Sequence, residues 1–255
     1  MKLSRQHKSG LFATLGYLVA LELMLIAAIL YWPSFRDNVP ALRIFSKPIP
    51  MLGEMIDEIE QFGSTAYVLG QHFFKGCNVL GCAAATLFAA GAVAGEAHRG
   101  TLEIYLMRPI SRRRLLLERW LTGALQVCVP VVLTTLTIPM LLERVDEVAA
   151  YGPLMWSAAH QCLFLLAIYG VTFLASTMGR MPLKIVFAVL LLSIFQFAIY
   201  MVKTVTHYSL FRLADIQTFL EVYDGSGPHV YWWWFGATIV LTLGASLAIF
   251  ERRVP

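Results

Sequence analysis

The chain is poor in charged residues. Lysine, arginine, aspartate and glutamate make up 14% of its 255 residues, whereas soluble domains carry about a quarter. Hydrophobic residues make up 58%, and the mean hydropathy is +0.67. This composition excludes an ordinary soluble domain and indicates an integral membrane protein. The formal net charge of +4 is small, and we expect no nucleic acid among its partners.

The chain also lacks the patterns that carry chemistry. Its four cysteines all lie in apolar runs, so it offers neither a disulfide framework nor zinc-site spacing. There is no H-E-x-x-H motif, and no aspartate lies inside an apolar run. Gly244-Ala245-Ser246 loosely resembles a membrane serine-protease motif, but Leu247 stands where that motif has glycine. We therefore expect no catalytic residue and no metal site, and an intramembrane hydrolase is a weak alternative.

Six apolar runs are present, each close to the roughly 20 residues that a helix needs to cross a bilayer. The first run is too long for the apolar part of a signal peptide, and no small-residue cleavage site follows it. We interpret it as a retained span, and residues 1–255 as one transmembrane domain. The predicted spans cover residues 11–32, 76–95, 121–142, 154–178, 185–202 and 231–250.

The distribution of charge sets the predicted orientation. Six spans place both termini on one side, and the loops of that side carry 13 of the 20 basic residues against four acids. The positive-inside rule therefore puts both termini in the cytoplasm of a cell membrane, which we expect to be a bacterial inner membrane. Tyr31 and Trp32 end the first span and aromatic residues 231–234 begin the last, both at the predicted outer interface.

Two outer loops have helical periodicity. In residues 52–62, apolar side chains recur at helical spacing and acidic side chains fill the other positions. This pattern predicts a short amphipathic helix lying on the outer membrane face. The loop 203–230 has a weaker version at Leu213, Ile216 and Leu220. Both surfaces predict contact with lipid or with an outer-side partner protein.

The segment 96–119 is a short basic stretch between the second and third spans. A polar break ends at Gly100, and Thr101 is placed to N-cap a short helix over 102–107. The apolar residues of this helix share one face, and Glu103 lies on another. The members of the apolar face are Leu102, Tyr105 and Leu106.

The end of this segment predicts the end of one helix and the start of the next. Pro109 ends the short helix, and Ser111 is placed to cap the next one. Arginines then anchor the third span at the lipid headgroups, namely Arg112, Arg113 and Arg114. The predicted architecture is a span, a short helix parallel to the membrane, a proline break and another span.

This segment resembles the signature of ABC-2 type transporter permeases. The resemblance rests on Glu96-x-x-x-Gly100-Thr101-Leu102-Glu103 followed by Pro109-Ile110-Ser111-Arg112. Six spans with cytoplasmic termini match the layout of that family over the whole chain, and the charged end Phe250-Glu251-Arg252-Arg253 fits it as well. The resemblance implies an all-α membrane protein with the ABC-2 fold, like that of type V exporters.

The resemblance also implies a transport subunit of an exporter without an ATPase site of its own. The chain has no G-x-x-x-x-G-K-[ST] motif. ATP and magnesium would therefore bind to a separate ABC ATPase subunit, present in two copies, while the permease forms a homodimer or pairs with a second permease. The short helix would act as a coupling helix seated in a cleft of the ATPase, with Gly100 permitting a tight turn. The coupling residues implied are Glu96, Gly100, Thr101, Leu102, Glu103, Tyr105, Leu106 and Pro109.

Polar residues inside the spans are costly and need specific partners. Glu22, near the middle of the first span, either faces a dimer interface or transport path, or is protonated or hydrogen-bonded to a neighbouring helix. His72 and Lys75 lie at the predicted outer edge of the second span, where snorkelling would accommodate them. We expect His160 and Gln161 to bond across helices. The alternative functions are an ion-coupled carrier or channel and a membrane scaffold that does not transport.

Overall fold

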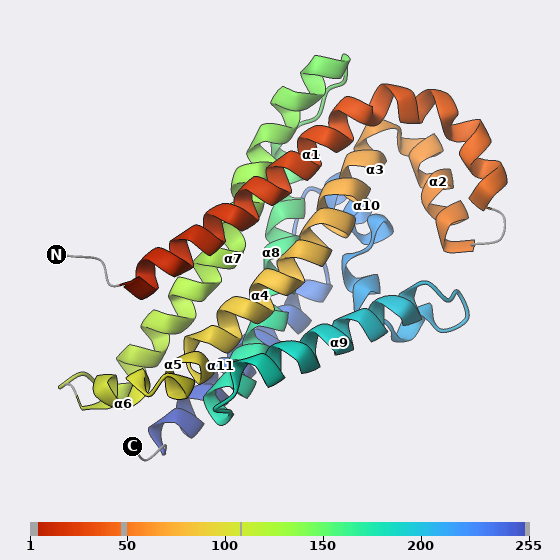
Figure 1. Ribbon diagram of the computed structural model, residues 1–255. Coiled ribbons are helices and arrows are strands. Elements are labelled where there is room, and N and C mark those ends of the chain that lie inside the picture. Colours follow the sequence, from red (N-terminus) through yellow and green to blue (C-terminus); the bar gives the residue numbers. More distant parts are fainter. Residues whose placement is uncertain (1–4, 47–49, 108, 253–255) are drawn as a thin grey trace.

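The computed structural model describes residues 5–46, 50–107 and 109–252, and those residues form helices and no strand. Six helices in these ranges are long and apolar enough to cross a membrane, which confirms the predicted all-α membrane fold. Figure 1 shows them side by side, with short helices at both ends of the bundle. The long elements are α1 (Arg5–Ser46), a rod of α3 (Ser64–Val68), the π-helix η1 (Leu69–Cys77) and α4 (Asn78–Ala92), then α7 (Arg112–Leu142), α8 (Tyr151–Met178), α9 (Pro182–Tyr200) and α11 (Tyr231–Glu251).

The second span begins earlier than predicted. Its rod starts at Ser64 instead of Gly76. The apolar pattern hides this start because Gln71, His72 and Lys75 interrupt it. A helix that packs inside a bundle can carry such side chains where they find partners, and this information is absent from hydropathy alone.

His72 shows how one of these polar side chains is accommodated. Its ring is 2% exposed, and Nε2 lies 3.3 Å from the Thr134 hydroxyl and 3.5 Å from the Thr135 hydroxyl of α7. The prediction that His72 snorkels to the interface is therefore wrong, because the ring faces the interior. Lys75 is exposed, with Nζ 3.4 Å from Oε1 of Gln71.

Helix α8 lies at the centre of the bundle and packs against α4, α7 and α11. Glycines on the neighbouring helices allow this close approach. A Cβ on Gly123 of α7 would collide with Tyr169, and one on Gly81 of α4 would lie 2.6 Å from Leu165. Tyr169 and Leu165 are both fully buried. The large side chains of α8 therefore occupy the space that the glycines leave.

Helix α1 continues beyond its predicted end at Trp32 and bends over one end of the bundle (Figure 1). This end is called the outer end, and the opposite end the inner end, after the predicted orientation. Helix α2 (Pro50–Phe62) packs under this extension. The helix predicted over 52–62 is therefore confirmed, but the middle of its apolar face lies against protein instead of lipid. Ile56 and Ile59 are 3% and 6% exposed. The extension of α1 supplies a covering surface that the pattern of α2 does not reveal.

The second outer loop folds into the bundle instead of lying on the membrane face. It forms three short helices that pack against the spans. Phe211, Ile216 and Phe219 are almost completely buried there, so the predicted surface helix is corrected to an inserted one. The three helices are η3 (Thr206–Tyr208), η4 (Leu210–Ala214) and α10 (Ile216–Gly225).

Side chains of the spans hold this inserted loop. Asn78 donates to the carbonyl of Ala214 (2.9 Å) and accepts a hydrogen bond from the Gln161 amide (2.9 Å). The Trp232 indole donates a hydrogen bond to Nδ1 of His160 (3.0 Å). Nε2 of the same ring therefore carries the proton and donates to the carbonyl of the residue before Ala214 (2.8 Å). The prediction that His160 and Gln161 bond across helices is confirmed.

Candidate functional site

The second span continues at its inner end into two short helices, α5 (Ala94–His98) and α6 (Thr101–Leu106). Ser176 of α8 fixes the break between α4 and α5. Its hydroxyl accepts a hydrogen bond from the N–H of Ala94 (2.9 Å) and donates to the carbonyl of Ala90 (3.1 Å). The direction in which α5 leaves the bundle is therefore determined by a contact with the central helix. Figure 1 shows α5 and α6 at the end of the bundle where α7 begins.

Gly100 makes the turn between α5 and α6. Its φ of 68° and ψ of 8° lie in the left-handed region, which costs other residues about 1 kcal/mol. The prediction that Thr101 caps α6 is wrong, because Gly100 occupies the cap position and Thr101 is the first helical residue. The Thr101 hydroxyl instead donates to the carbonyl of Glu96 (3.3 Å).

An ion pair that is largely buried joins the two ends of the segment. The Glu96 carboxylate contacts the guanidinium of Arg119 on α7, and both side chains are 12% exposed. Arg119 also donates to the carbonyl of Ala92 at the end of α4 (2.7 Å). Its guanidinium lies over the Tyr105 ring of α6, with its carbon 5.0 Å from the ring centroid.

Arg119 is absent from the residues that the sequence predicts for this site, where it counts only toward the positive charge of the loop. The available signal was the opposite charge of Glu96 and Arg119 near the two ends of one short segment. That signal is weak by itself, because loops on this side carry many arginines. Only the closure of the segment on itself shows which arginine the carboxylate meets.

The exposed face of α6 differs from the one expected. Leu102 is 3% exposed and Tyr105 and Leu106 are half-buried, so this face packs on the chain's own bundle. The large apolar side chains that point outward are Ile104, 53% exposed, and Met107, 74% exposed. The face expected to enter a partner's cleft is thus covered already. The exposed residues around α6 also include Glu103 and Pro109, and the assignment of all these residues to a coupling element stays a prediction.

The arginines predicted as headgroup anchors begin α7. Ser111 caps this helix as predicted, since its hydroxyl accepts a hydrogen bond from the N–H of Arg114 (3.3 Å). Arg113 forms an ion pair with Glu251 at the end of α11, and Arg112 donates to the Glu251 carbonyl (2.9 Å). The start of α7 is therefore tied to the end of α11. Contact of these arginines with headgroups stays a prediction.

Glu22 is half-buried between α1 and α7. Its Oε2 accepts a hydrogen bond from the hydroxyl of Thr137 (3.2 Å). Of the two expectations for this carboxylate, the structure shows the bond to a neighbouring helix. A role in a transport path stays a prediction.

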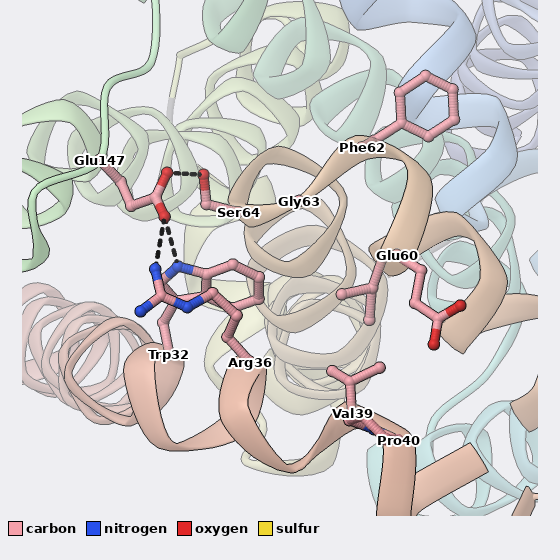
Figure 2. A pocket seen from close by; sticks show the side chains of 10 residues that line it. Trp32, Arg36, Val39, Pro40, Glu60, Phe62, Gly63, Ser64 and Glu147 are labelled. Atoms are coloured by element: carbon pink, nitrogen blue, oxygen red, sulfur yellow. Dashed lines mark hydrogen bonds and ion pairs between the residues drawn. The ribbon is translucent and has the colours of Figure 1, made fainter.

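A pocket of about 490 Å³ lies at the outer end, between α1, α2, α3 and the loop after η2 (Glu143–Val145). Figure 2 shows Glu147 at its polar wall. Its carboxylate accepts hydrogen bonds from the Trp32 indole (2.9 Å) and the Ser64 hydroxyl (2.8 Å), and Arg36 lies 3.8 Å away. Both carboxylate oxygens are therefore engaged in joining outer elements of the bundle. Within the described ranges, no cluster of His, Cys, Asp and Glu side chains could hold a metal ion.

A family model described as an ABC-2 family transporter protein matches residues 9–224. The chain belongs to the ABC-2 transporter family. The match includes the whole segment 96–119, which confirms the resemblance found there, and it makes the chain a permease of an ABC transporter in a membrane. Membership also implies that the permease pairs with an ABC ATPase. No curated protein and no solved structure matches the chain.

Proposed function

We propose that α6 is the element through which a separate ATPase subunit drives this permease, and that the transporter is an exporter. The observation that supports this proposal is a short helix whose one face is packed on the bundle while Ile104 and Met107 remain exposed. Apolar side chains exposed together on the water-facing end of a membrane protein indicate a surface that a partner covers. Exposed Glu103 beside them adds a charge that can select the partner.

The assembly that fits this surface contains two permease copies and two ATPase subunits. ATP and magnesium would bind to the ATPase subunits, and this chain would bind no cofactor. A second permease copy would find apolar surface on α9, where large side chains face outward along its length. Examples are Phe187, Leu191 and Phe195, which are 71%, 61% and 60% exposed.

The orientation follows from the same proposal. An ATPase in the cytoplasm requires α6 on the cytoplasmic side, which places the chain termini there and the pocket beside Glu147 outside. The basic residues around α6 agree with this placement in a bacterial inner membrane. An outer-side partner would meet the acidic exposed face of α2.

The test is co-purification of the full chain with its ATPase, followed by substitution of the exposed residues of α6 and its C-cap. Ile104→Asp and Met107→Asp should each weaken ATPase binding at least tenfold, because each places a charge in an apolar contact. Val148→Asp is the matched control, since Val148 is 85% exposed in the outer loop after η2. The control should bind the ATPase as the wild type does.

Two results would contradict this proposal. The first is a wild-type chain that transports its cargo while no ATPase accompanies it. The second is unchanged ATPase binding in Ile104→Asp and Met107→Asp, which would mean that the partner docks elsewhere.

A further inference from the structure

The Arg119 side chain joins α7 to the three neighbouring elements of the coupling segment. It belongs to α7, pairs with Glu96 of α5, donates to the last carbonyl of α4 and lies against the Tyr105 ring of α6. The backbone at Arg119 is in turn fixed to the central helix. The Tyr169 hydroxyl of α8 donates to the carbonyl of Trp120 (3.1 Å), the next residue along α7.

The chemistry of these contacts favours arginine in particular. A guanidinium presents several N–H groups in one plane and can stack on an aromatic ring, whereas a lysine ammonium is a compact point charge. The carbonyl of Ala92 also lies at the C-terminal end of a helix, where a positive charge is stabilised by the helix dipole. Each contact therefore uses a different property of the same side chain.

The ion pair leaves two polar atoms without a hydrogen bond. Oε2 of Glu96 and Nε of Arg119 are buried and have no hydrogen-bond partner among the described residues. A carboxylate and a guanidinium can also pair through two parallel bonds, which uses both oxygens and two nitrogens. A two-bond arrangement of the same pair would satisfy both unpartnered atoms. An element with two discrete arrangements is what carries coupling between distant parts of a protein.

We propose that Arg119 is the positioning residue that transmits a displacement of α6 to the inner ends of α4 and α7, with Glu96 as its counter-ion. This inference rests on the proposed function, because it is the docked ATPase that would move α6. Movement of α6 shifts the Tyr105 ring, and the guanidinium follows the ring. Its bonds to Glu96 and Ala92 then move the ends of α4 and α7 together.

The test measures displacement between α4 and α7 in the reconstituted complex with its ATPase. The four native cysteines are first replaced, and spin labels are attached at Leu87 of α4 and Leu121 of α7, which are both 55% exposed. The inter-label distance is compared with ADP and after trapping with ATP and vanadate. The wild type should show a nucleotide-dependent change.

Matched variants separate positioning from mere structural support. Tyr105→Leu and Arg119→Lys should shift the equilibrium between the two arrangements about tenfold and abolish most of the distance change. Tyr105→Phe keeps the ring and should keep the change. Arg114→Lys, an exposed arginine on the same helix, is the charge control and should behave as the wild type.

A further variant covers the case in which single changes prevent folding. Glu96→Gln combined with Arg119→Gln removes both buried charges together, so it avoids an unpaired charge. It should fold and bind the ATPase but lose the nucleotide-dependent change.

The outcomes are distinct. A full distance change in Tyr105→Leu and Arg119→Lys, or in the double variant, overturns the role of Arg119 while the ATPase interaction stands. Equal loss in Tyr105→Phe and Tyr105→Leu also overturns it, because the ring contact would then be irrelevant. If the wild-type chain binds no ATPase, the proposed function fails, and this role fails with it.

Discussion

The two ends of the bundle hold polar groups in different ways. At the inner end, one buried ion pair between Glu96 and Arg119 fixes a short helix whose tip leaves Ile104 and Met107 uncovered. At the outer end, a neutral hydrogen bond from Asn78 holds the loop 203–230, and the Phe211, Ile216 and Phe219 side chains of this loop are covered. The loop 203–230 is therefore held by its own chain, whereas the exposed residues of the inner end form the surface that we propose a partner covers.

The largest effect should come from breaking the ion pair of the inner end. Arg119→Ala leaves the Glu96 carboxylate buried without a counter-ion, and we expect a loss of about 3–5 kcal/mol of stability. Arg114→Ala removes an exposed pair with Glu118 of the same helix and should cost at most about 0.5 kcal/mol. Thermal unfolding in detergent, followed by circular dichroism, measures both. Equal losses would show that the Glu96–Arg119 pair is no more buried than a surface pair.

A smaller effect is expected from the neutral bonds of the outer end. Asn78→Leu leaves the Ala214 carbonyl and the Gln161 amide without their partner, which should cost about 1–3 kcal/mol. The control is Asn38→Leu, because Asn38 is exposed and its only bond in the described structure is to a carbonyl of its own helix. Protease accessibility of the loop 203–230 should rise in Asn78→Leu and stay unchanged in the control. Unchanged accessibility in both would mean that Asn78 does not hold the loop.

Replacing Gly100 by alanine and replacing Gly91 by alanine should change stability in opposite directions. Gly100→Ala forces a side chain into the left-handed region and should destabilise the inner end by about 1 kcal/mol. Gly91→Ala lies in α4 with open space around it, so it should be neutral or stabilise by about 0.5–1 kcal/mol. The melting temperatures of the two variants should therefore move in opposite directions. A shift in the same direction would remove the backbone argument for Gly100.

The smallest effect on stability is expected from the protonation of Glu58 at the outer end. Burial in α2, with Asp215 and Glu54 nearby, raises the pKa of Glu58 from 4.5 to about 7. The folded state therefore binds this proton more tightly than the unfolded state, so stability falls as pH rises from about 4.5 through 7. Glu58→Gln should flatten that part of the pH profile and stabilise the protein at pH 8, by less than about 1 kcal/mol because the group is partly exposed. Parallel melting curves for variant and wild type from pH 5 to pH 8 would contradict this expectation.

Patterns of local origin were predictable from the sequence. The six spans follow from apolar runs long enough to cross a bilayer, and the cap at Ser111 follows from a rule about adjacent residues. Errors arose where a distant part of the chain changes the local balance. Gly100, in the left-handed region, occupies the cap position expected for Thr101. The His72 ring lies in the interior, where it contacts the hydroxyls of Thr134 and Thr135.

The residues of the candidate site also differ in whether a local pattern could predict them. Glu96 and Gly100 could be named as candidates from the motif, because a motif is a property of neighbouring residues. Arg119 could not, because its partner lies 23 positions away and several other arginines carry the same charge. The exposed face of α6 could not be predicted either, because either apolar side of a short helix can be the buried one.

The sequence by itself determined that this chain is an ABC-2 membrane protein with six spans and a patterned segment between the second and third. Hydrophobicity and backbone rules act over a few residues, so a linear pattern contains them. The tertiary structure alone decided that Arg119 meets Glu96, that Leu102 faces inward while Ile104 faces out, and that the last outer loop enters the bundle. Those outcomes depend on which surfaces come together, because burial and ion pairing are properties of neighbours in space.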